Sequence, residues 1–110
     1  MKTYYNPEDL SKFGDIAKEA PELARRFFEY YNAAFAEGEL SEREKALIAL
    51  GVAHALQCPY CIHAATDKCL KTGSNPAEMT EAIHVATAIR AGATLSHGIQ
   101  MRNLVGEVSM

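Results

Sequence analysis

The sequence predicts an all-α protein, and three features support this prediction. Apolar residues recur at three- and four-residue spacing through most of the 110 residues, as they do on one face of a helix. Helix start signals are frequent, since Asn6-Pro7, Ser41–Glu44 and Asn75-Pro76 each combine a capping side chain with a suitable first turn. No stretch alternates apolar and polar residues as a strand does. We expect a bundle of about five to six helices in one domain over residues 1–110, with N-terminal helices in 1–40 and a core in 41–106.

Two helices are predicted before residue 40. Asn6 caps the first, which has Pro7 at its first position, and Pro21 ends this helix and begins the second. Gly38 is a natural stop for the second helix. Apolar side chains recur in it every four residues, at Leu23, Phe27, Tyr31 and Phe35.

Three further helices are predicted after residue 40. The helix over 46–56 is apolar almost all round, so we expect it to be buried on every side. The next helix runs over 59–72 and stops at Gly73, which can adopt a left-handed conformation. A long helical pattern then covers 77–105, with Gly92 as a candidate kink.

Assembly into a homo-oligomer is predicted from two of these segments. The apolar third helix needs more cover than five helices of one small chain can supply. Alanine and glycine dominate residues 82–93, and such small side chains let helix axes approach closely, within or between subunits. We expect a trimer or a hexamer.

The motif Cys58-Pro59-Tyr60-Cys61 carries the most specific chemistry. Pro59 suits a first helical position, so we expect Cys58 at the N-cap and Cys61 in the first turn. Two such residues lie roughly 5 to 6 Å apart at Cα, within the range of a disulfide. The positive end of the helix dipole favours the thiolate form, and helix-cap electrostatics alone favour Cys58 as the more acidic thiol. Tyr60 is expected at the surface or at the mouth of a pocket.

Redox chemistry is preferred over two competing interpretations of the pair. A structural zinc site needs four ligands, and Cys69 lies ~12 Å further along the same helix, so no metal and no cofactor is predicted. The pair could also be two small core residues. Cys69 itself is either a core residue or a second resolving thiol.

His54 is the candidate base, because it lies four residues before Cys58 and could accept the thiol proton. The alternative is a hydrogen-bonded core histidine. His63 should face away from the thiols, about 200° round the helix from Cys61. His84 and His97 belong to the long last helix; packing could bring one of them to the site, but a structural role is expected for each.

The composition excludes several classes of partner. The 11 basic and 14 acidic residues are interspersed, for a net charge of −3, so neither nucleic acid nor a membrane surface is an expected partner. No apolar run reaches the ~18 residues of a membrane span, and the first residues do not read as a signal peptide. A cytoplasmic location is therefore expected, where thiols stay reduced.

Residues 47–61, with the sequence LIALGVAHALQCPYC, resemble the core of the AhpD-like alkylhydroperoxidase group in the carboxymuconolactone decarboxylase superfamily. The resemblance covers about residues 40–105. It implies an all-α fold, trimers or hexamers, and reduction of a small-molecule hydroperoxide through the CxxC pair, which an external dithiol or thioredoxin-like reductant restores. The segments 3–5, 27–31, 79–82 and 97–101 are similar to the arsenosugar-biosynthesis-associated peroxidase-like proteins, a likeness that implies no particular substrate.

The likeness to the AhpD pattern is incomplete at its proton relay. That pattern has a glutamate twelve residues before the first cysteine and a histidine four after the second, where this chain has Ala46 and Ala65. His54 is the substitute by position. The resemblance implies that Cys61 attacks the peroxide and Cys58 resolves it. The alternative function is a non-catalytic dithiol module that binds a soft ligand such as trivalent arsenic or a metal.

Overall fold

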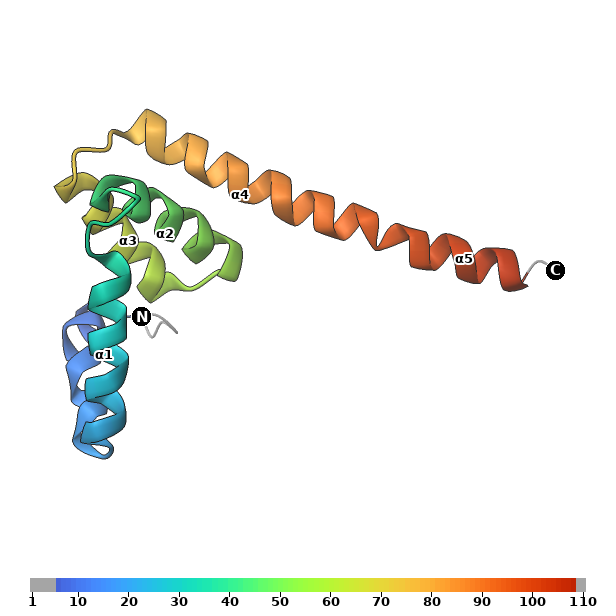
Figure 1. Ribbon diagram of the computed structural model, residues 1–110. Coiled ribbons are helices and arrows are strands. Elements are labelled where there is room, and N and C mark those ends of the chain that lie inside the picture. The colour runs from blue at the N-terminus through green and yellow to red at the C-terminus, as the bar shows by residue number, and fades with distance from the viewer. Residues whose placement is uncertain (1–5, 109–110) are drawn as a thin grey trace.

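The computed structural model describes residues 6–108, and these residues form helices only (Figure 1). The predicted all-α class is therefore confirmed for this part of the chain. Residues 3–5, which carry part of the narrower resemblance, lie outside it. The elements in chain order are η1 (Pro7–Lys18), α1 (Pro21–Phe35), α2 (Glu42–Leu56), α3 (Pro59–Lys71), α4 (Pro76–Ser96) and α5 (Gly98–Val108).

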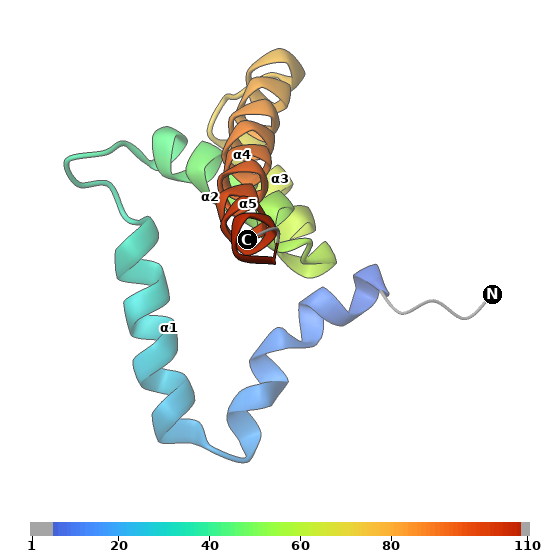
Figure 2. The ribbon, with the colours of Figure 1, turned by 90° about the vertical axis from the view of Figure 1, so that its right-hand side faces the viewer.

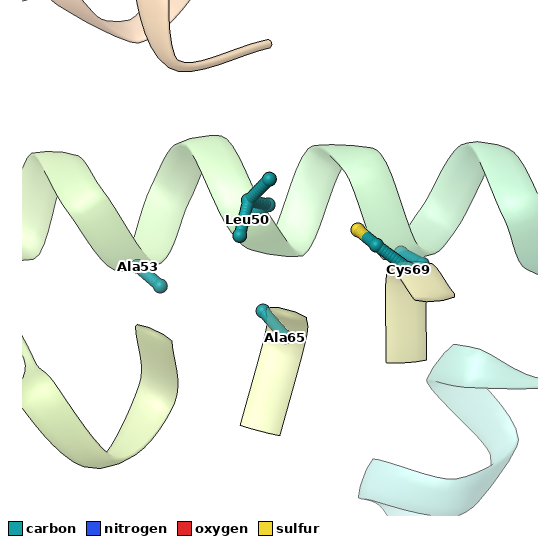
Figure 3. Close-up of a cluster of buried hydrophobic side chains, with 5 residues drawn as sticks. Leu50, Ala53, Ala65 and Cys69 are labelled. Atoms are coloured by element: carbon teal, nitrogen blue, oxygen red, sulfur yellow. The ribbon is translucent and has the colours of Figure 1, made fainter. Parts of the chain in front are cut away.

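The core lies between α2 and α3. Leu50 and Ala53 of α2 gather with Ala65 and Cys69 of α3, and Ala46 completes the cluster (Figure 3). Most of these side chains are small, so the two helix backbones come close together. Because each of the five is at most 4% exposed, this interface is the driest part of the described chain.

Helix α4 packs on a second face of α2. A Cβ atom added to Gly51 would meet the carbonyl oxygen of Ala82 at 3.4 Å, so glycine permits a close approach of the two helices. The side chains of Arg43 and Glu78 form an ion pair across the same interface. Capping boxes begin both helices. The box at Ser41 was predicted, whereas Asn75 was predicted as a cap followed by Pro76, without its partner Glu78.

The N-terminal pair η1 and α1 diverges from its connection toward α2 and α3 (Figure 2). Phe13 and Phe28 join them edge to face, with ring centroids 5.4 Å apart. Asn6 caps η1 as predicted, accepting a hydrogen bond from the Glu8 N–H at 3.2 Å. The element is a 3₁₀-helix over 12 residues, however, which is longer than such helices usually run.

Two predicted features of the helices are wrong, and a third is confirmed. α1 ends at Phe35 with Ala36 as its cap, so Gly38 is not the stop. α4 runs through Gly92 without a break, because one glycine costs a helix only ~1 kcal/mol, and the interruption falls at His97. The predicted stop at Gly73 agrees with its φ of 90°.

Helix α2 is not buried on every side, contrary to the prediction. Its side chains at Ile48, Val52 and Leu56 are 53%, 52% and 69% exposed. An apolar sequence shows only that a helix face can be buried, because burial needs a neighbour that packs on that face. α3 and α4 pack on other faces of α2 and leave the face with Ile48, Val52 and Leu56 open.

Helices α4 and α5 form a long rod that extends away from the other helices (Figure 1). The radius of gyration is 18.9 Å, against about 13 Å for a compact chain of similar length. None of the helices within residues 6–108 combines the length and hydropathy that a membrane span needs. The rod exposes large apolar side chains at Val85, Ile89, Leu95, Ile99, Met101, Leu104, Val105 and Val108.

Candidate active site

The turn between α2 and α3 is held at both of its ends. Gln57 adopts a left-handed conformation with φ 56°, and its N–H reaches the carbonyl oxygens of Ala53 and His54. The Cys58 N–H also donates to Ala53, at 3.2 Å. Arg90 of α4 donates to the carbonyl oxygen of Ala55 at 2.9 Å, which satisfies another group at the end of α2.

Cys58 and Cys61 begin α3 in the predicted arrangement. Cys58 is the N-cap, and its Sγ accepts a hydrogen bond from the Cys61 N–H at 3.3 Å. The two Cα atoms are 5.2 Å apart, and the two sulfur atoms form a disulfide. Once the pair is reduced, this N–H and the helix dipole stabilise negative charge on the Cys58 sulfur.

The two cysteines differ in their access to solvent. Cys61 is exposed, whereas Cys58 is half-buried. Cys61 is thus the residue of the pair that solvent reaches more readily, while the sulfur of Cys58 accepts the backbone hydrogen bond. Exposure thus favours Cys61 for contact with a solute, whereas helix-cap electrostatics favour negative charge on Cys58.

Both cysteines line an open apolar groove of about 950 Å³. Its walls come from η1 and α1 on one side and from α2 and α3 on the other, the elements that Figure 2 shows around the open end of the N-terminal pair. Tyr60 also lines it, in agreement with the expectation that this residue lies at a pocket. The apolar and aromatic walls are formed mainly by Phe13, Ile16, Phe27, Tyr31, Phe35, Ile48, Val52 and Leu56, and the charged groups are Asp9, Lys12, Lys45 and Lys68.

His54 lies on a different face of α2 from the residues that line the groove. It is two residues from both Val52 and Leu56, about 200° round the helix from each. Its imidazole Nδ1 donates to the Leu50 carbonyl oxygen at 2.8 Å, which identifies Nδ1 as the protonated nitrogen. The base role predicted for His54 is not tested by these contacts and stays a prediction.

Cys69 and the two relay positions belong to the core. Cys69 is fully buried, and this burial raises the pKa of its free thiol, an effect that Arg43 partly offsets. Ala46 and Ala65 are 1% and 4% exposed in the same cluster. No group of three histidine, cysteine or acidic side chains that could hold a metal ion occurs within residues 6–108.

The fold and the site define a small helical protein with a dithiol at a helix N-terminus. The chain belongs to the carboxymuconolactone decarboxylase family, whose model matches residues 21–101. A Paracoccus denitrificans protein named uncharacterized protein 4 in cox locus is 31% identical over 102 residues, which are 93% of this chain and 92% of the relative.

Two solved structures are similar. A protein from Methanobacterium thermoautotrophicum is 34% identical with a TM-score of 0.75, and the match covers 78% of this chain and 97% of that one. A carboxymuconolactone decarboxylase family protein from Legionella pneumophila, solved in its apo form, is 31% identical with a TM-score of 0.69, over 76% and 75% of the two chains. These likenesses confirm the family that the sequence around the cysteines resembles.

The groove lysines were missed in the analysis of the sequence. In the sequence, the aromatic residues of α1 form a regular stripe, and such a stripe is typical of a helix face that packs in a core. The spacing from Cys61 to Lys68 is seven residues, two helical turns, and this spacing could have placed the lysine on the same face of α3 as the thiol.

Proposed function

We propose that this protein is a thiol-dependent peroxidase, a dithiol oxidoreductase that reduces an organic hydroperoxide through Cys61 and Cys58. The observation that carries the proposal is a cysteine pair at disulfide distance, capping a helix in the wall of an open groove. Membership of the carboxymuconolactone decarboxylase family is compatible with this activity. A buried structural disulfide would have no need of the groove or of an exposed sulfur.

The proposed reaction consumes two thiols for each hydroperoxide. The Cys61 thiolate attacks the peroxide oxygen, the O–O bond breaks, and the alkoxide takes a proton and leaves as the alcohol. Cys61 is now a sulfenic acid. The Cys58 thiolate attacks the Cys61 sulfur, the S–O bond breaks, hydroxide leaves and takes a proton to become water, and the disulfide forms.

The assignment of roles combines the exposure of one sulfur with the hydrogen bond to the other. Cys61 is the more exposed residue of the pair, so we assign it to the attack on the peroxide. The N–H that reaches the Cys58 sulfur favours its anion, which is the form that attacks a sulfenic acid. An external dithiol, such as a thioredoxin-like protein, restores the pair by exchange and becomes a disulfide itself.

One equivalent of hydroperoxide tests this function. The reduced protein should lose two of its three thiols and the mass of two hydrogen atoms, with Cys69 still free. Cys58→Ser should trap a sulfenic acid on Cys61, detected as a dimedone adduct. Cys69→Ser is the matched control and should react like the unaltered protein. If Cys61→Ser instead traps the acid on Cys58, the two roles are reversed.

A different result would support the alternative of a binding module. If all three thiols survive the peroxide and the reduced pair binds a trivalent arsenical one to one, the peroxidase proposal is wrong. Two adjacent thiolates suit a soft ligand of this kind, so the same site can hold it without turnover.

We further propose that copies of the chain assemble through the rod of α4 and α5. Its large apolar side chains are exposed, among them Val85, Leu95 and Val108 at 65%, 80% and 86%. Monomeric proteins rarely expose apolar surface on this scale. Light scattering should return a trimer or a hexamer, and a monomer at micromolar concentration would contradict this proposal.

A further inference from the structure

The groove beside the thiols contains a cation on the same helix as Cys61. Cys61 lies at the beginning of α3, and Lys68 lies two turns further along the same helix. Seven residues of helix separate their backbones by ~10 Å, and two full turns bring both side chains to one face. The groove therefore joins a reactive sulfur to a cation over a distance that a small peroxide cannot span.

Lys68 differs from the other two lysines of the groove in its partners. Lys12 is paired with Asp9 at 3.2 Å, and the Lys45 ammonium donates to the carbonyl oxygen of Ala36. Lys68 lies over the rings of Phe35 and Tyr31, at 4.1 and 5.5 Å from their centroids. Within residues 6–108, no carboxylate forms an ion pair with it.

The surroundings of Lys68 favour an anion that arrives with an apolar body. The aromatic rings hold the ammonium beside the groove without neutralising its charge. Apart from its few charged groups, the groove that Lys68 shares with the thiols is lined mainly by aliphatic and aromatic side chains, which include Ile48 and Val52 of α2. An apolar chain removes these side chains from water, and a terminal anion pairs with the lysine.

We infer that the substrate is an elongated apolar hydroperoxide with an anionic end, such as the hydroperoxide of a fatty acid. Its carboxylate pairs with Lys68, its chain lies along the groove, and its peroxide group reaches Cys61. This inference rests on the proposed peroxidase function and adds the class of substrate. Hydrogen peroxide would leave the groove unfilled, and a neutral lipid would leave Lys68 without a partner.

The test compares three peroxides that differ in one property at a time. Linoleic acid hydroperoxide and its methyl ester have the same chain and peroxide but differ in charge, and hydrogen peroxide has no chain. The reduced protein should lose its thiols about tenfold faster with the acid than with the ester, the effect of one charged hydrogen bond. Lys68→Gln should remove that preference, so that the acid and the ester react at equal rates once each rate is divided by the rate of the same variant with hydrogen peroxide.

Lys71→Gln is the matched control variant. Lys71 lies on the same helix, pairs with Asp67 at 2.8 Å, and does not line the groove. Its substitution should keep the preference for the acid. Equal rates for acid and ester in the unaltered protein, or a preference that survives Lys68→Gln, would overturn the inference and leave the peroxidase function standing.

A binding measurement separates this inference from the proposed function. Calorimetry with linoleate, which has no peroxide group, should show binding to the disulfide form and weaker binding to Lys68→Gln. The absence of linoleate binding, as expected if a second copy of the chain fills the groove, would overturn the inference alone. Binding that depends on Lys68 without any oxidation of thiols by the three peroxides would overturn the proposed function and the substrate assignment together.

Discussion

Two residues of α2 allow a direct test of which helix face is core and which is groove. Leu50 is 1% exposed in the α2–α3 interface, whereas Ile48 is 53% exposed and lines the groove. Leu50→Ala removes buried methyl groups and leaves a cavity, at a cost of about 3 kcal/mol in the free energy of unfolding. Ile48→Ala removes a side chain only about half buried, at a cost of about 1 kcal/mol.

Urea unfolding followed by far-UV circular dichroism measures this difference. Both variants should be compared with the unaltered protein at one protein concentration, because association also contributes to apparent stability. A difference of about 2 kcal/mol between the variants is a large part of a typical stability of 5–15 kcal/mol, so it is readily resolved. The slope against urea should stay constant if neither variant changes the surface exposed on unfolding.

The same two variants should differ in the rates at which hydroperoxides oxidise their thiols. Ile48→Ala widens the groove, so we expect slower oxidation of the thiols by linoleic acid hydroperoxide and an unchanged rate with hydrogen peroxide. The folded fraction of Leu50→Ala should keep the ratio of the two rates. Equal losses of stability in the two variants would refute the reasoning, because they would mean that a second copy of the chain covers Ile48 as fully as α3 covers Leu50.

Three further predictions concern single side chains. The hydrogen bond from Arg43 lowers the pKa of Glu78 from its usual value, so Glu78→Gln should lower the melting temperature at neutral pH. The difference from the unaltered protein should vanish as the pH falls through the lowered pKa of the folded state. If the difference in melting temperature persists in acid, the charge of Glu78 is not its cause. Burial raises the pKa of the Cys69 thiol, so iodoacetamide should label this thiol only after unfolding. Mass spectrometry counts the labels, and labelling of Cys69 in the native protein would contradict its burial. If His54 is the base, His54→Ala should slow alkylation of the reduced pair ~10²- to 10⁴-fold at neutral pH, and an unchanged rate would leave it a structural histidine.

The sequence predicted those features of the fold that depend on neighbouring residues. Ser41 and Asn75 cap their helices and Pro59 begins α3, because each of these features needs only a few residues around it. The short distance between the Cα atoms of Cys58 and Cys61 was predictable for the same reason, since an N-cap residue and a residue of the first turn are always close. The cysteine pair at the start of a helix was therefore predictable without knowledge of the packing.

Features that depend on tertiary contacts were not predictable in this way. Whether Ile48 is buried depends on which neighbours pack on α2, and its own apolar character gives no information on that point. α4 continues past Gly92 to Ser96, because the cost of one glycine is small beside the stability of a long helix, so the glycine did not set the end of α4. The role inferred for Lys68 depends on its contact with two rings of α1, which are distant in the sequence and adjacent in the structure.

The two alanines at the relay positions affect how the thiols can exchange protons. In the AhpD pattern, which the chain resembles, a glutamate and a histidine occupy these positions, but Ala46 and Ala65 lie in the dry interface with Leu50. An ionised carboxylate there would lose its hydration, so the core side of the pair cannot conduct protons. Under the proposed function, the thiols then exchange protons with solvent on the groove side, where Cys61 is exposed, or through His54. The charge on Cys58 then depends on the Cys61 N–H and the helix dipole, which act without transferring a proton. Under the proposed function, the fixed electrostatics at the N-terminus of α3 therefore act where the AhpD pattern has its glutamate and histidine, and His54 remains the candidate base.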